Sequence, residues 1–206
     1  MQVLLDGEVI AVERPTLAAA LGAARRVSEA RGRVIIEAKL DDVAIPDDLL
    51  SDPTEDEFAG SIVTMVTANP RTLVTETLAA VSDALRQSRA EQVAAADLLQ
   101  TGRVQEAMQR MGSVLTTWDQ ARQAVISGAA LLGEPLSAGT SAGRVAEAAG
   151  ALGAVLSAIK GQVAAEDWSG LADTLAVDLC EQSDRWCDLL GTIGTDRAAR
   201  PDNGAI

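Results

Sequence analysis

The spacing of apolar residues changes abruptly near residue 69, and this change constrains the fold more than any other feature of the sequence. Before it, short apolar runs are separated by turn residues, as in QVLL-DG-EVIAV at the N-terminus. After it, apolar residues recur every three or four positions over long stretches. A period of two is typical of β-strands, and a period of 3.6 is typical of helices. The sequence therefore predicts an α+β module at residues 1–69, followed by a helical bundle at residues 70–194.

The N-terminal module is predicted to contain a small sheet and one long helix. Asp6-Gly7 lies between two β-prone runs, which is a strong hairpin signal. Thr16 is expected to cap a helix that Gly32 ends. Further strands are expected in RVIIEAKL, VAI and SIVTMVTA, with an acidic loop before the last. If side chains alternate regularly along the strand RVIIEAKL, one face of it carries Val34, Ile36, Ala38 and Leu40.

This order of elements over residues 1–68 resembles the ubiquitin-like β-grasp fold. The resemblance includes a strand at the very N-terminus, one helix crossing the sheet, and RVIIEAKLDDVAIPDD in place of the middle hairpin. Ubiquitin and the sulfur carriers similar to it end in a free Gly-Gly carboxylate, which is their reacting group. Here the last strand continues into NPRTLVTETL, so the resemblance implies a binding scaffold and not conjugation or sulfur transfer.

Residues 70–194 are predicted to form an antiparallel four-helix bundle made of two αα-hairpins. Asn69 and Pro70 occupy the expected cap and first-turn positions of the first helix. Thr101-Gly102 ends it, and either Asp167 or Ser169 is expected to cap the last helix. The tail TDRAARPDNGAI, residues 195–206, is expected to be disordered.

One short motif suggests a serine hydrolase, but its surroundings do not fit. GTSAG, residues 139–143, matches G-x-S-x-G, which requires a preceding strand and a base to accept the serine proton. The chain contains no histidine, and the motif follows the loop-like EPLSA between two helices. We therefore interpret Ser141 as a helix cap and predict no catalytic residue here.

The composition also argues against metal and cofactor chemistry. Without histidine, sites built on imidazole are excluded, and two cysteines alone cannot form a structural zinc site. Cys180 and Cys187 are interpreted as core residues. The stretch DDVAIPDDLLSDPTEDE offers the oxygen ligands that calcium prefers, but it lacks the spacing and central glycine of an EF-hand. We predict no metal and no cofactor. Most such acidic runs are solvated loops, and among functional interpretations a docking surface for a basic partner is favoured over a calcium site.

The charge distribution restricts the partners. The net charge is −13 and no basic patch stands out, which argues against nucleic acid and anionic membrane surfaces. There is no signal-peptide pattern and no long uninterrupted apolar run, so a cytoplasmic location is expected.

These observations predict a non-catalytic intracellular interaction protein, an adaptor or chaperone-like module with a protein partner. The predicted partner-binding residues are the acidic Asp47, Asp48, Glu55 and Asp56, and an apolar stripe of Val104, Met108, Met111, Leu115 and Trp118. One alternative is a ligand- or metal-binding protein or enzyme that uses carboxylates alone, through residues 41–57 or through Asp173, Asp184 and Asp188. Further alternatives are an export chaperone of the flagellar type and a homodimer formed through the tryptophan-bearing helices.

Overall fold

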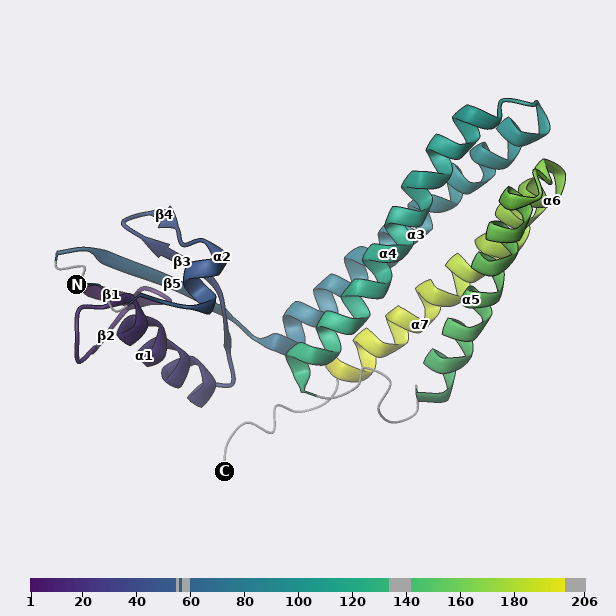
Figure 1. Cartoon of the computed structure of the whole chain (residues 1–206). Coiled ribbons are helices and arrows are strands. Elements are labelled where there is room, and N and C mark those ends of the chain that lie inside the picture. The colour runs from purple at the N-terminus through teal and green to yellow at the C-terminus, as the bar shows by residue number, and fades with distance from the viewer. Residues whose placement is uncertain (55, 57–59, 134–141, 199–206) are drawn as a thin grey trace. The chain divides into compact units, whose positions relative to one another are not determined.

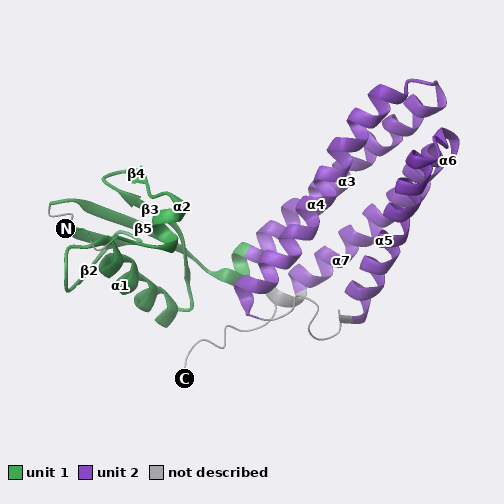
Figure 2. Cartoon of the chain, in the orientation of Figure 1, with its two compact units in different colours: residues 1–73, 202–206 green, residues 74–201 purple. Residues whose placement is uncertain are grey.

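The computed structural model of the chain describes residues 1–54, 56, 60–133 and 142–198. It forms two compact units that divide between Leu73 and Val74 (Figure 2). The first, here called the N-terminal unit, holds a five-stranded mixed sheet, and the second, the helical unit, holds only helices (Figure 1). The protein is therefore α+β, as the change in hydrophobic period predicts.

The sheet of the N-terminal unit has the strand order β2-β1-β5-β3-β4. Its strands are β1 (Gln2–Leu5), β2 (Glu8–Ile10), β3 (Val34–Leu40), β4 (Val43–Ala44) and β5 (Ile62–Ala68). The pairs β1–β2, β3–β5 and β3–β4 are antiparallel, whereas β1 and β5 are parallel. This mixed sheet with one long helix is compatible with a β-grasp-like module.

Helix α1 (Leu17–Ala30) covers one face of the sheet, and its ends follow the sequence signals. The Thr16 side chain accepts a hydrogen bond from the Ala19 amide at 3.2 Å, which confirms the predicted cap. Leu17, Ala20 and Leu21 pack with inward residues of the strands into one core. Beyond the helix, Gly32 has a positive φ of 63°, a conformation that glycine adopts without steric cost.

A bulge in β3 overturns the predicted alternation on that strand. The register against β5 shifts between Ile35 and Glu37, so Ile36 is the extra residue. Ile35 packs against the core together with Ala38, whereas Ile36 is 52% exposed. Placing Ile36 on the same face as Ala38 was wrong, because one inserted residue exchanges the faces of all residues before it.

The acidic segment after β4 contains a helix that the sequence does not reveal. Helix α2 (Asp47–Ser51) begins directly after Pro46, with Asp47 and Asp48 in its first turn. Carboxylates are favourable there because the amide groups at a helix N-terminus carry partial positive charge. The expected acidic loop is therefore helical over these residues, while Glu55 lies outside the described residues.

The hairpin turn between β1 and β2 is held by the carboxylate of Asp6. The Thr67 amide donates to Asp6 Oδ1 at 2.8 Å, and the Thr67 hydroxyl donates to Oδ2 at 2.6 Å. Arg33 in turn donates to the Thr67 hydroxyl and carbonyl. The hydrogen bonds from Thr67 lower the pKa of Asp6 below its ordinary value.

This network predicts a loss of stability in acid. A carboxyl group with a lowered pKa in the folded state stabilises the fold above its unfolded pKa, and the contribution disappears as the pH falls through the folded value. Asp6→Asn should lower the free energy of unfolding by about 1–2 kcal/mol at neutral pH and flatten its dependence on pH below about 4. Amide hydrogen exchange of β1 and β5 measures this. The exposed Asp97→Asn is the control, and equal acid sensitivity in both variants would contradict the prediction.

The helical unit is an antiparallel bundle of long helices (Figure 1). They are α3 (Pro70–Gln100), α4 (Val104–Leu132), α5 (Ala142–Ala164) and a continuous last helix composed of α6 (Trp168–Asp173), the π-helical η1 (Thr174–Leu179) and α7 (Cys180–Ala198). At the start of α3, Asn69 Oδ1 accepts hydrogen bonds from the backbone amides of Arg71 and Thr72, which confirms the predicted cap. At the start of the last helix, Asp167 Oδ1 accepts a hydrogen bond from the Gly170 amide, so Asp167 and not Ser169 is the cap. That helix continues past residue 194 to Ala198. Residues 199–206 of the expected tail, and Ser141 of the expected cap, lie outside the described residues.

The bundle core contains polar groups that join α3 to the last helix. The buried Gln92 donates from Nε2 to the hydroxyls of Ser88 and Ser183, at 3.0 Å in both cases. Cys180 and Cys187 are free, buried thiols, which confirms their interpretation as core residues. Cys187 donates to the Ser82 carbonyl at 3.2 Å. Burial raises the pKa of the Cys180 thiol, so this group stays protonated near neutral pH.

Candidate functional site

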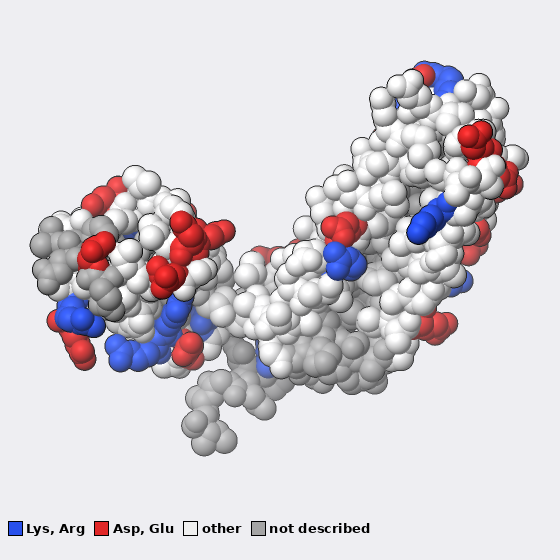
Figure 3. Space-filling model, in the orientation of Figure 1, with Lys and Arg blue, Asp and Glu red and all other residues white. Residues whose placement is uncertain are grey.

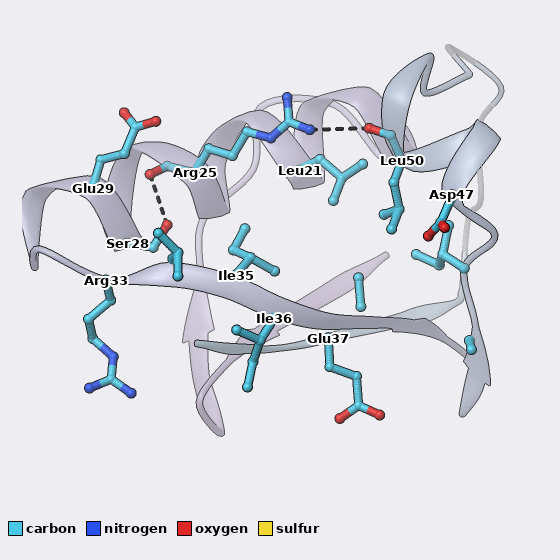
Figure 4. Close-up of a pocket in the computed structure, with 14 residues that line it drawn as sticks. Leu21, Arg25, Ser28, Glu29, Arg33, Ile35, Ile36, Glu37, Asp47 and Leu50 are labelled. Carbon is cyan, nitrogen blue, oxygen red and sulfur yellow. Dashed lines mark hydrogen bonds between the residues drawn. The ribbon is translucent and has the colours of Figure 1, made fainter. Parts of the chain in front are cut away.

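The N-terminal unit contains a groove of about 470 Å³ between α1, β3 and α2 (Figure 4). Leu21 reaches into it from α1, Ile35 from β3 and Leu50 from α2. Ile36 and Glu37 point to the other side of the strand. The bulge therefore decides which isoleucine side chain points into the groove.

Two arginines line the groove, and both are held by the protein itself. Arg25 Nη2 donates to the Leu50 carbonyl at 3.1 Å, which joins α1 to α2 across the top of the groove. Arg33 is engaged by Thr67, as described above. The Arg25 contact therefore fixes α1 against α2 without neutralising its guanidinium group, whereas Arg33 lies 3.8 Å from the Asp6 carboxylate.

The end of the groove near α2 is acidic. Asp47 lines the groove, and Asp48 and Asp56 are exposed nearby in the sequence. Within the described residues, neither Asp47 nor Asp48 forms an ion pair, and residues 41–60 include no lysine or arginine. Figure 3 shows acidic side chains over the part of the N-terminal unit that carries β4 and α2. The structure thus places two of the four predicted acidic residues on one short helix beside an apolar groove.

The predicted apolar stripe on α4 lies mostly inside the helical unit. Met111 and Trp118 are buried, and Val104 and Met108 are half-buried against the same core. Leu115 is partly exposed and borders a pocket together with Trp118. The stripe therefore lies on the inner face of α4, and its last two members, Leu115 and Trp118, line a pocket.

This second pocket has a volume of about 380 Å³ and lies between α4, α5 and α7. Apolar side chains provide most of its lining, among them Leu152, Trp118 and Trp186. The two indole rings meet edge to face, with ring centroids 6.0 Å apart and planes at 86°. Neither buried indole N–H has a hydrogen-bond acceptor among the described residues.

The carboxylates considered for catalysis do not gather at one site. Asp173, Asp184 and Asp188 are exposed, and Asp184 accepts a hydrogen bond from Arg89 at 2.8 Å. Where the structure is described, no three side chains of the metal-ligating types come together. The stretch 41–57 is described only in part, so a cation site there is not addressed.

The groove residues Leu21, Arg25, Ile35 and Leu50 were not among the predicted site residues. Leu21 has a sequence signal, because it lies on the predicted apolar face of α1. The contact of Arg25 with Leu50 has no signal in the sequence, since the two residues are 25 positions apart.

Comparisons with protein-family models, curated proteins and solved structures gave no match to this chain. Of the helices in the described part of the chain, none has the length and apolar character needed to cross a membrane.

Proposed function

We propose that this chain is a non-catalytic, cytoplasmic protein-interaction protein, an adaptor or chaperone-like module, whose partner binds the N-terminal unit. We also propose that the N-terminal unit is a ubiquitin-like β-grasp module used as a binding scaffold. One observation carries the first proposal: an apolar groove ends beside the carboxylates of Asp47 and Asp48, which have no cationic partner in the described structure. Apolar contacts supply affinity, and unpaired charges at the rim select partners of opposite charge.

The test is charge reversal at the acidic end of the groove. The chain is purified at native level under gentle salt, and co-purifying proteins are identified by mass spectrometry. The triple variant Asp47→Lys, Asp48→Lys and Asp56→Lys should lose a stoichiometric partner. The control reverses the exposed Asp97, Asp173 and Asp178 in the helical unit, which changes the net charge equally. A partner that both variants retain, or both lose, would overturn docking at this groove.

The same experiment covers the narrower idea of an export chaperone of the flagellar type, because the partner would then be a secreted subunit.

A second candidate function is binding of an apolar small molecule between α4, α5 and α7. The two-tryptophan pocket favours it, because about 380 Å³ lies within the usual size of small-molecule sites. A side chain added at Gly153 would enter open space, since a Cβ there meets no atom within 4 Å. Gly153→Leu should therefore abolish binding of the fluorescent probe 1-anilinonaphthalene-8-sulfonate, whereas the exposed Gly143→Leu should not. Unchanged probe binding in Gly153→Leu would reject this pocket.

A further inference from the structure

The outer edge of β3 is open over half of its length. β3 has seven residues, and β4 pairs only with Lys39 and Leu40. The Ala38 carbonyl accepts a hydrogen bond from the Ile45 amide at 3.0 Å. Among the described strands, none pairs with Val34–Glu37 on the side away from β5. Such an edge presents backbone N–H and C=O groups to which another extended segment can add.

The groove lies directly beside this open edge (Figure 4). Successive side chains of a strand point to opposite faces of a sheet. Every second side chain of a segment added to β3 would therefore point to the face covered by α1, where Leu21, Ile35 and Leu50 line the groove. This geometry selects a segment with apolar side chains at alternate positions.

The charges at the α2 end of the groove favour a basic residue in that segment. Arg33 lies 3.8 Å from the Asp6 carboxylate, whereas Arg25 donates to the neutral Leu50 carbonyl and keeps its positive charge beside α2. Asp47 lines the groove at the end formed by α2, and Asp48 follows it in the same helical turn. The two carboxylates of α2 outnumber the Arg25 guanidinium, so the net charge at that end is negative and a lysine or arginine of the partner would find its complement there.

We propose that a partner protein docks by adding an extended segment to the β3 edge at Val34–Glu37, with alternate apolar side chains in the groove and a basic residue beside Asp47 and Asp48. This proposal rests on the proposed function, because it specifies how the partner of that same groove binds. Backbone hydrogen bonds would supply much of the affinity, and the groove and the two carboxylates would supply the selectivity.

The probes are two acetylated and amidated peptides, KKTVTVTV and TVTVTVKK, which cover both strand directions. They are titrated into the full-length chain, and NMR records amide shifts and hydrogen exchange. We expect one peptide to bind and to protect amides within Val34–Glu37. Asp47→Lys with Asp48→Lys should weaken that binding about tenfold or more, and the matched reversal of Asp97 and Asp178 should leave it within about twofold.

N-methylation of the peptide separates strand addition from side-chain contact. Alternate residues of an added strand direct their N–H groups toward β3 or away from it. Methylating all threonine amides or all valine amides should therefore abolish binding in one case and preserve it in the other. Equal effects of the two methylated sets, or binding without protection at Val34–Glu37, would overturn the proposal.

Failure of the proposal can be distinguished from failure of the proposed function. If neither peptide binds at millimolar concentration while a native partner is still lost on reversal of Asp47 and Asp48, strand addition is wrong and docking at the groove stands. If the native partner also ignores that reversal, both are wrong.

Discussion

Replacing Trp186 with alanine is expected to lower the free energy of unfolding of the helical unit by about 3–5 kcal/mol. Trp186 is only 6% exposed and packs edge to face against Trp118. Truncation removes its buried apolar surface and leaves a cavity that surrounding helices fill only in part. The loss is a large fraction of the about 5–15 kcal/mol that stabilises a typical domain.

Denaturant unfolding followed by tryptophan fluorescence measures this effect, because all three tryptophans of the chain belong to the helical unit, at positions 118, 168 and 186. The control is Val93→Ala on α3, where the side chain is 44% exposed and lies outside the core cluster of the helical unit. The control should change stability by less than about 0.5 kcal/mol. Similar midpoints for Trp186→Ala and the control would show that the tryptophan pair is not part of the core.

In the N-terminal unit, the largest effect is expected from Met65→Ala, with a loss of about 2–5 kcal/mol. Met65 lies on the central strand β5 and is completely buried in the core beneath α1. Its neighbour Val66 lies on the opposite face of the same strand and is 37% exposed. The two positions share backbone environment and differ mainly in what covers the side chain.

Hydrogen exchange of the β1 and β5 amides reports on this unit, because it contains no tryptophan. Val66→Ala should cost about 1 kcal/mol or less, since part of its surface is already in water. If the two variants exchange at the same rate, the assignment of the inner and outer faces of β5 is wrong.

The sequence predicted best the features that depend on near neighbours in the chain. The Asp6-Gly7 turn, the Thr16 cap and the start of α3 at Pro70 all appear where expected. Each of these signals acts within about one helical turn or one hairpin turn, so it can be recognised without knowing the fold.

The sequence was less informative where a residue's environment comes from distant segments. Ile36 looks like a core residue until the register of β3 against β5 reveals the bulge. Apolar residues on α4 suggest either a core or a binding surface, and only the packing of the other helices puts Met111 and Trp118 inside. A hydrophobic period identifies the apolar face of an element, but it does not identify what covers that face.

The candidate site shows the same division. The hydrophobic period by itself determined that the chain is α+β. The composition and charge pattern determined that it lacks histidine and carries an acidic segment around Asp47 and Asp48. Only the tertiary structure decided that Asp47 lies at the end of an apolar groove beside an open strand edge. The physical reason is that caps, turns and periodicity are local interactions, whereas a groove exists only after α1, β3 and α2 have packed together.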